Sequence, residues 1–223
     1  MELPSISKDL QKRFISAGIL APIVLAVIYT GGIVYNTLIV AVAVIMSFEW
    51  QGIINSGVQE LDENSKKKWN ASGIAYVTIF ASSLIYLRGI ESGAGIVFLM
   101  LFLVWATDIA AYFTGRLLKG PKIYPPISPN KTWSGLLGGM AAAGFVGAIA
   151  SPFVPMGFFT MILLGMLLAI ISQIGDFFES WVKRQFGVKD SGTLIPGHGG
   201  LMDRLDGFTT VAPAFVLFIL LNS

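Results

Sequence analysis

The sequence contains no cysteine, a single histidine and few charged residues. The absence of cysteine excludes disulfides, thiolate metal sites and cysteine nucleophiles, although it identifies no cellular compartment. Charged residues make up 13% of the 223 residues, whereas 54% are hydrophobic, and the mean hydropathy is +0.73. A soluble globular protein of this size needs far more polar surface. The composition therefore predicts an integral membrane protein.

Long apolar segments account for most of the chain. Because the hydrocarbon core of a bilayer is ~30 Å thick, roughly 20 helical residues are needed to cross it, and a helix satisfies its own backbone groups in lipid. We therefore predict an all-α fold, a polytopic membrane bundle of about seven transmembrane helices. The candidate segments are Phe14–Thr30, Val34–Ile54, Asn70–Leu87, Gly95–Thr114, Thr132–Ala150, Pro155–Ile174 and Phe208–Leu221.

The basic residues predict the orientation in the membrane. Lys8, Lys12 and Arg13 precede the first apolar segment without a small-residue cleavage site after it, so we interpret that segment as an anchor helix and not as a signal peptide. With the N-terminus in the cytoplasm, every lysine and arginine except Arg88 falls on the cytoplasmic side, as the positive-inside rule requires. The longer, charged connections also fall there. We therefore expect a cytoplasmic N-terminus and polar chemistry at the cytoplasmic face.

The chain shows no internal repeat, low-complexity tract or second domain. We expect one integral membrane domain over residues 1–223, in which residues 1–93 form N-terminal spans and residues 94–223 carry the motifs described next. The polar stretch 55–70 predicts a solvated loop close to anionic head groups.

Asp108 lies deep in an apolar segment, LVWATDIAAYFTGR. A carboxylate there is energetically costly unless it faces protein, water or a cation. Helical spacing places Asp108, Tyr112 and Gly115 on or near one face. The pattern favours a polar wall of an active site, and the alternative is a hydrogen bond that packs two helices together.

The connection that follows is rich in proline, lysine and small polar side chains. Its three prolines at 125, 126 and 129 preclude a regular helix. Ser128, Asn130, Lys131 and Thr132 then come just before the next span. A lysine at the start of a helix predicts phosphate binding, because its ammonium group and the helix N–H groups attract the same anion. A lysine that anchors the membrane border is the alternative.

A polar stripe marks the end of the sixth apolar segment. Ser172, Asp176, Glu179, Ser180 and Lys183 recur at i, i+4, i+7, i+8 and i+11, which places them on one side of a helix. Carboxylates at that depth suit hard cations such as Mg²⁺, which prefer oxygen ligands and retain substrate phosphates as partners. For Glu179 and Lys183, a self-neutralised pair on the helix is the alternative.

The glycine-rich stretch IPGHGGLMDRLDG ends the most polar run of the chain, Ser180 to Asp206. Glycines let a backbone approach a phosphate closely, so His198, Gly199 and Gly200 predict phosphate or nucleotide binding, with a capping role for His198 as the alternative. Asp203 and Asp206 are three residues apart and face the same way if a helix begins there. We predict that they complete a cation site.

Together these motifs resemble the phosphatidate cytidylyltransferases, also called CDP-diacylglycerol synthases. The elements around Asp108, Lys131 and Asp176 look like the upstream motifs of that family, whereas the N-terminal half agrees with it only in being hydrophobic. The family's signature is matched in order and spacing at Ser180, Lys183, Arg184, Lys189, Asp190, Pro196, His198, Gly199, Gly200, Asp203, Arg204 and Asp206.

The resemblance implies transfer of a cytidylyl group from CTP to phosphatidate, giving CDP-diacylglycerol and pyrophosphate, with Mg²⁺ as cofactor. It implies a multi-span protein of the bacterial inner membrane that is active at the cytoplasmic face and, as is frequent in the family, a homodimer. Its partners would be CTP, phosphatidate and membrane lipid, with no nucleic acid. One or two Mg²⁺ ions are expected, and participation of a monovalent cation stays open.

The resemblance also implies residue roles. By motif position, Asp176 and Asp203 resemble the metal-binding aspartates of the family, with Asp206 as a further acidic member and Lys131 in the phosphate-binding segment. We therefore predict that Asp176, Asp203, Asp206 and Lys131 are catalytic. The predicted substrate-binding residues are Asp108, Ser128, Asn130, Thr132, Lys183, Arg184, Lys189, His198, Gly199, Gly200 and Arg204.

Three other activities are alternatives to this interpretation. A CTP-dependent lipid kinase would use similar groups but direct the attack to the γ-phosphate. A CDP-alcohol phosphatidyltransferase is disfavoured because its aspartate pattern is absent. Asp108 and Asp176 at membrane depth also suit a cation-coupled transporter, but such proteins often contain inverted repeats, and here the charge gathers at one face.

Overall fold

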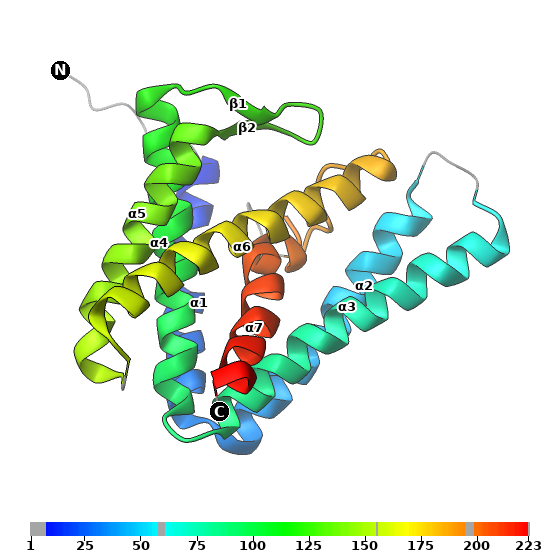
Figure 1. Ribbon diagram of the computed structural model, residues 1–223. Coiled ribbons are helices and arrows are strands. Elements are labelled where there is room, and N and C mark those ends of the chain that lie inside the picture. The colour runs from blue at the N-terminus through cyan, green and yellow to red at the C-terminus, as the bar shows by residue number, and fades with distance from the viewer. Residues whose placement is uncertain (1–7, 58–60, 155, 195–198, 223) are drawn as a thin grey trace.

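The computed structural model describes residues 8–57, 61–154, 156–194 and 199–222. Within these ranges the chain forms seven α-helices, one short 3-10 helix and one two-stranded sheet (Figure 1). The elements are α1 (Lys8–Thr30), α2 (Gly32–Asn55), α3 (Glu63–Gly89), α4 (Gly93–Leu118), β1 (Lys122–Tyr124), β2 (Ser128–Thr132), α5 (Trp133–Ala150), η1 (Ser151–Phe153), α6 (Phe158–Gln185) and α7 (Met202–Asn222).

Six helices, α2 to α7, are long and apolar enough to cross a membrane, and Gly18–Thr30 of α1 is a shorter apolar helix. The prediction of a polytopic helical bundle with about seven membrane helices is therefore confirmed. In Figure 1, α4 and α5 run side by side, α2 and α3 form a second pair, and α6 crosses obliquely from the end of α5 toward α2 and α3. The helix α7 packs against α6 and α3.

Helix α3 begins at Glu63, seven residues before the predicted start at Asn70. The side chain of Asp62 caps this helix, because it accepts hydrogen bonds from the backbone N–H groups of Asn64 (3.2 Å) and Ser65 (3.3 Å). The expectation of a solvated loop through residue 70 is therefore wrong for residues 63–70. The helix begins at Glu63 because Asp62 caps it there, although the residues of its first turns are polar.

Two other helix boundaries matter for function. Helix α6 continues to Gln185, so the whole polar stripe from Ser172 to Lys183 lies on one helix, as predicted. Helix α7 begins at Met202, six residues before the predicted start at Phe208, so Asp203 and Asp206 are both in its first turns. The condition for these two aspartates to face the same way is thus met.

Arg88 was the one basic residue predicted to lie on the outer side. Its Nε donates to the carbonyl of Ile28 (2.8 Å) and its Nη2 donates to the carbonyl of Tyr29 (3.1 Å). These carbonyls belong to the last turn of α1, where intrahelical donors are missing. Arg88 therefore joins the end of α3 to the end of α1.

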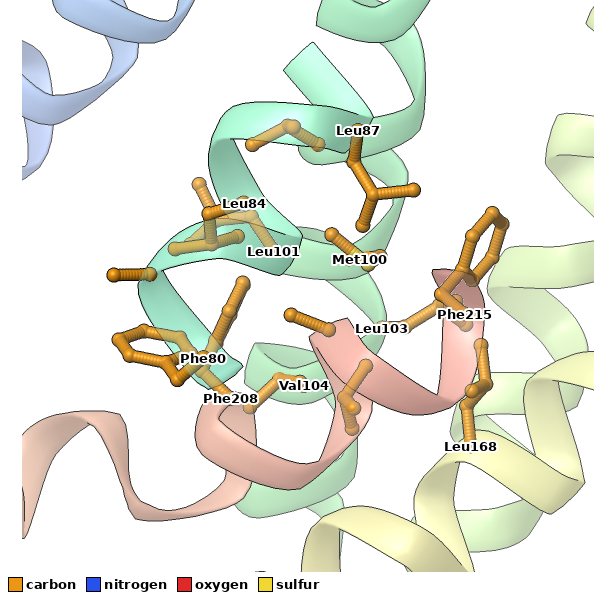
Figure 2. Close-up of a cluster of buried hydrophobic side chains, with 14 of the residues drawn as sticks. Phe80, Leu84, Leu87, Met100, Leu101, Leu103, Val104, Leu168, Phe208 and Phe215 are labelled. Carbon is orange, nitrogen blue, oxygen red and sulfur yellow. The ribbon is translucent and has the colours of Figure 1, made fainter. Parts of the chain in front are cut away.

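Part of the apolar core lies where α3, α4, α6 and α7 meet, and α2 contributes further buried residues to the same core. Figure 2 shows large side chains from all four helices in contact around α7. Because lipid is as apolar as leucine, such a core favours association mainly through close packing and not through escape from water. It fixes α7 beside α6. Its labelled members are Phe80, Leu84, Leu87, Met100, Leu101, Leu103, Val104, Leu168, Phe208 and Phe215.

Residues 135–150 are rich in Gly and Ala, and such small residues allow α5 to approach its neighbours closely. A Cβ on Gly147 would lie 2.2 Å from the carbonyl oxygen of Met161 in α6, too close for any side chain. The backbones of α5 and α6 are therefore in direct contact at this point.

An aromatic cluster joins the second half of α6 to α2 and α3. Trp50 stacks on Phe178 with 6.5 Å between ring centroids, and its indole N–H donates to the carbonyl of Trp69 (2.9 Å). Trp69 in turn contacts Phe186 edge to face at 5.2 Å. The cluster holds the polar half of α6 in place; its members are Trp50, Trp69, Tyr76, Phe178, Trp181 and Phe186.

The proline-rich connection forms an antiparallel hairpin of β1 and β2, with Lys122 paired to Thr132 and Tyr124 paired to Ser128. The prediction that it contains no regular helix is confirmed. Thr132 ends β2 and caps α5, because its hydroxyl accepts a hydrogen bond from the N–H of Gly135 (3.1 Å). Lys131 is thereby placed one residue before the cap of α5.

Candidate active site

A cavity of about 480 Å³ lies among five elements, α4, β2, α5, α6 and α7. Each element contributes at least one polar or glycine residue to its wall. The lining residues are Trp105, Asp108, Ala111, Tyr112, Asn130, Lys131, Thr132, Gly135, Leu136, Gln173, Asp176, Asp203, Arg204 and Asp206. Polar groups separated by up to a hundred residues in the chain are thus brought to one space.

Most of the predicted site residues face this cavity. Asp108, Asn130, Lys131, Thr132, Asp176, Asp203, Arg204 and Asp206 all line it. Six predicted residues are not among its lining residues: Ser128, Lys183, Arg184, Lys189, Gly199 and Gly200. His198 lies outside the described residues.

Lys131 and Asp176 form an ion pair inside the cavity. The Nζ of Lys131 lies 2.6 Å from Oδ2 of Asp176, and the two side chains are 15% and 30% exposed. The ammonium group also lies 4.7 Å from the ring centroid of Phe177, a cation–π contact. The hydroxyl of Ser180 donates to the other oxygen of Asp176 (3.2 Å). A pair that is partly open to a cavity can exchange either partner for a ligand.

A second ionic cluster is closed. Lys183 lies between Glu179 Oε1 (2.9 Å) and Asp203 Oδ1 (2.5 Å), and the side chains of these three residues are at most 10% exposed. The i, i+4 pair of Glu179 and Lys183, which was the alternative to a functional role for these two residues, is therefore present, and Asp203 extends it. Within the described residues, Glu179 Oε2 accepts no hydrogen bond. Removal of the lysine would leave buried negative charge.

The second oxygen of Asp203 anchors the preceding loop. Asp203 Oδ2 accepts hydrogen bonds from the backbone N–H of Ser191 (2.9 Å), the hydroxyl of Ser191 (3.0 Å) and the N–H of Gly200 (2.9 Å). The other oxygen, Oδ1, has Lys183 as its donor. The contact of Gly200 with this cluster is therefore its hydrogen bond to Asp203. A Cβ on Gly200 would lie 2.0 Å from the hydroxyl oxygen of Ser191, so no side chain fits there.

Asp108 and Asp206 complete the acidic side of the cavity. Asp108 is exposed, and its Oδ1 lies 3.4 Å from the side-chain amide of Gln173 in α6, a long hydrogen bond. The two interpretations of Asp108 are therefore compatible, because it lines the cavity and also contacts a second helix. One oxygen of Asp206 accepts the N–H of Gly207 (2.7 Å). The negative charges of Asp176 and Asp108 repel that of Asp206.

The remaining predicted residues lie outside the cavity wall. Ser128 is in β2, opposite Tyr124. Arg184 is exposed and donates to the carbonyl of Val188 (2.7 Å), and Lys189 is exposed. Gly199 has a positive φ of 87°, a conformation that side chains disfavour. Direct substrate contacts by these residues stay predictions.

Glu49 was missed by the motif search. It lies near the end of α2 with 9% exposure and accepts hydrogen bonds from Ser191, Leu201 and Met202. The feature that identified Asp108 is also present at Glu49, because Glu49 is a carboxylate within an apolar segment, IMSFEWQGII. Its partners are mostly backbone groups, which no side-chain motif contains.

The donor set of the cavity suits a hard cation, although no preformed site is present in the described part of the chain. There, no three His, Asp or Glu residues are grouped closely enough to hold a metal ion. Asp108, Asp176 and Asp206 nevertheless face one space that also contains Lys131 and Arg204. Carboxylate oxygens are the ligands that divalent cations such as Mg²⁺ prefer, and substrate phosphates commonly supply the rest.

Comparison with known proteins identifies the family of this chain. Residues 58–222 match the model of the cytidylyltransferase family. A phosphatidate cytidylyltransferase of Brucella suis is 39% identical over 251 residues, which cover 94% of this chain and 93% of that protein. One from Rickettsia bellii is 34% identical over 230 residues, with 96% and 94% covered. The chain therefore belongs to the cytidylyltransferase family.

Proposed function

We propose that this protein transfers the cytidylyl group of CTP to phosphatidate, forming CDP-diacylglycerol and pyrophosphate. The observation that carries the proposal is the cavity of about 480 Å³, in which Lys131, Arg204 and four aspartates meet within a membrane bundle. Two polyanions must come together in this reaction, so charge neutralisation is the main task of the site. The names of the relatives from Brucella suis and Rickettsia bellii support the same activity.

The reaction needs little acid–base chemistry from the protein. An anionic phosphate oxygen of phosphatidate attacks the α-phosphorus of CTP, a new P–O bond forms, and the bond to the β-phosphate oxygen breaks. Both electrons of that bond leave with pyrophosphate, so charges and atoms balance without a protein nucleophile. The protein must orient the two phosphates and stabilise the charge that entering and leaving groups share.

Lys131 and Arg204 are the cations that line the cavity. In the proposal, Lys131 exchanges Asp176 for a phosphate of CTP, which leaves the carboxylate of Asp176 available. Arg204 suits two-pronged contact with phosphate oxygens because its guanidinium is planar. Asn130 and Thr132 lie beside Lys131 and add polar contacts at the start of α5.

Asp176 and Asp203 would hold Mg²⁺, with Asp206 as a further acidic neighbour. Asp203 Oδ2 accepts three hydrogen bonds that fix the carboxylate's orientation, and Oδ1 is paired with Lys183 (2.5 Å), so Lys183 would have to release Asp203 when Mg²⁺ binds. One or two Mg²⁺ ions, when bound, would neutralise phosphate charge at the reacting centre. The residues of this chain set where that charge is placed.

The apolar side of the cavity suits the lipid substrate. Trp105, Tyr112 and Leu136 line it, and Trp105 and Tyr112 are 37% and 59% exposed on α4. Phosphatidate would reach the site laterally, with its head group beside Lys131 and its acyl chains along the outer surface of the bundle. We place this site at the cytoplasmic face of a bacterial inner membrane, because the positive-inside rule assigns the basic connections to that side.

The decisive experiment uses purified protein, phosphatidate in mixed micelles and CTP labelled at the α-phosphate. We expect phosphatidate-dependent transfer of the label to lipid and its loss when EDTA removes divalent cations. Label in the lipid only from γ-labelled CTP would identify a kinase instead. Ion flux in proteoliposomes without CTP turnover would support the transporter and overturn the proposal.

The absence of cysteine gives a direct test of orientation. Ser65→Cys near the start of α3 and Ser92→Cys between α3 and α4 each introduce a single thiol at opposite ends of α3. In intact cells, a membrane-impermeant maleimide is expected to label the cysteine at position 92 and not the one at position 65. The reverse labelling would contradict the proposed cytoplasmic site.

A further inference from the structure

Glu49 connects the second helix to the start of the last one. Its Oε1 accepts the N–H of Leu201 (2.7 Å), and its Oε2 accepts the N–H of Met202 (2.8 Å). The hydroxyl of Ser191 also lies 3.0 Å from Oε2. These partners are 142 to 153 residues further along the chain. Both oxygens of a 9% exposed carboxylate are thus used to hold one loop and one helix end.

The two amides held by Glu49 are at the beginning of α7. The first N–H groups of a helix have no intrahelical acceptor, and they carry the positive end of the helix dipole. The buried carboxylate of Glu49, from a different helix, both accepts hydrogen bonds from these N–H groups and places a negative charge at the positive end of the dipole. Because unsatisfied backbone groups are costly where water is scarce, the first turn of α7 depends on α2.

The same layer of contacts reaches Asp203. The Ser191 hydroxyl lies 3.0 Å from Glu49 Oε2 and 3.0 Å from Asp203 Oδ2, and with one proton it donates to one of them at a time. Gly200 is enclosed between these groups, since a Cβ there would lie 2.7 Å from Glu49 Oε2. Glu49 itself is not among the residues that line the cavity.

We infer that Glu49 is a positioning residue for cytidylyl transfer: it fixes the start of α7 and, through Ser191 and Gly200, the orientation of Asp203. The inference rests on the proposed function. It assigns a role in the site to α2, whose residues Gly32–Asn55 precede the segment 58–222 that matches the family model. The site therefore requires a helix outside the matched segment.

Glu49→Gln is the sharpest test. Each oxygen of Glu49 accepts a backbone N–H, so a glutamine in either orientation points its NH₂ group at one of those donors. We expect kcat to fall by about 10²-fold, the loss that a misplacement of roughly 1 Å can cause. The KM for CTP should change by less than about threefold, because Lys131 and the other residues that line the cavity stay in place.

Two further variants separate positioning from general damage. Glu49→Asp keeps the negative charge near α7 and should recover part of kcat. Glu63→Gln removes a carboxylate that is 92% exposed on α3 and should leave kcat unchanged. An unchanged kcat in Glu49→Gln would overturn the inference. So would an equal loss of kcat in Glu49→Gln and Glu49→Asp that is accompanied by a raised KM for CTP.

Hydrogen exchange gives a readout that does not depend on turnover. In Glu49→Gln, the amides of Leu201 and Met202 should exchange faster, whereas amides in the middle of α4 and α5 should keep wild-type rates. Faster exchange throughout the bundle would indicate loss of structure and overturn the positioning role. A wild-type protein that makes no CDP-diacylglycerol would instead overturn the proposed function, so the two failures are distinguishable.

Discussion

Two ionic centres lie along α6, and they differ in how open they are. Lys131 and Asp176 form a single pair with 15% and 30% exposure at the wall of the cavity. Lys183, Glu179 and Asp203 form a closed cluster in which no side chain exceeds 10% exposure. Both centres contain residues that the sequence motifs predicted to be catalytic or to bind substrate. The comparison indicates that the motifs predicted from the sequence combine groups that are open to the cavity with groups that hold the site together.

The largest effect is expected in the closed cluster, from Lys183→Met. The substitution leaves the carboxylates of Glu179 and Asp203 buried without their shared cation, and breaking a buried pair in this way costs about 3–5 kcal/mol. We expect a large drop in apparent Tm in detergent and little folded protein on size exclusion. Lys67→Met, at a 78% exposed position, is the matched control and should melt like the wild type. An unchanged Tm for Lys183→Met would contradict the difference between the two centres.

In the open centre, Asp176→Asn should remove activity without removing the fold. We expect turnover to fall by about 10²–10³-fold, the effect of deleting one preorganised electrostatic group, while the apparent Tm stays close to that of the wild type. Glu91→Gln, an exposed carboxylate between α3 and α4, serves as the control. Near-normal CTP- and Mg²⁺-dependent turnover would refute the metal-binding role of Asp176.

Asp203 belongs to the closed cluster, where it accepts hydrogen bonds from Lys183, Ser191 and Gly200, and it also lines the cavity. Asp203→Asn should therefore lower both turnover and apparent Tm, with the loss of turnover comparable to that of Asp176→Asn. Parallel measurement of the two variants checks this. If Asp203→Asn lowers Tm while turnover per folded molecule is retained, Asp203 supports the loop and takes no part in the reaction.

The sequence predicted the open centre better than the closed one. Asp108 and Asp176 were identified because charge within apolar segments is unusual whatever the fold, and Lys131 because a lysine at the start of a helix suits phosphate binding. The i, i+4 spacing also predicted the pair of Glu179 and Lys183. The donors of Asp203 Oδ2 could not be foreseen, since they are mostly backbone groups of a loop whose path is set by tertiary contacts. Glu49 carried the same signal as Asp108, a carboxylate within an apolar segment, but its backbone partners in the later loop could not be foreseen.

Helix boundaries show a similar limit. Hydropathy located the membrane helices, but it placed the start of α3 at Asn70 because lysines fill residues 66–68. The local cap at Asp62 was the stronger determinant. The prolines at 125, 126 and 129 excluded a helix but contained no information on strand register, which depends on pairing between β1 and β2.

Lys131→Gln tests the exchange of partners proposed for the open centre. A hydrogen bond to a charged group contributes about 1.5–3 kcal/mol, so kcat/KM for CTP should fall by roughly 10- to 100-fold, with most of the change in KM if Lys131 holds a phosphate already in the ground state. Lys122→Gln in the exposed strand β1 is the control. A fall in apparent Tm without any change in kcat/KM would assign Lys131 to membrane anchoring or packing.

The smallest effects are expected from Arg184→Gln and Lys189→Gln. Both side chains are exposed and lie outside the cavity wall, although motif analysis assigned them to substrate binding. Exposed charges act through water and are screened by salt, so each variant should change kcat/KM by less than about fivefold, and the difference should shrink between 50 and 500 mM salt, that is, over roughly a tenfold rise in ionic strength. A salt-independent loss comparable to that of Lys131→Gln would mean that these residues contact a phosphate directly. The division into an open and a closed centre would then need a third group of binding residues, at the end of α6 and in the segment that follows it.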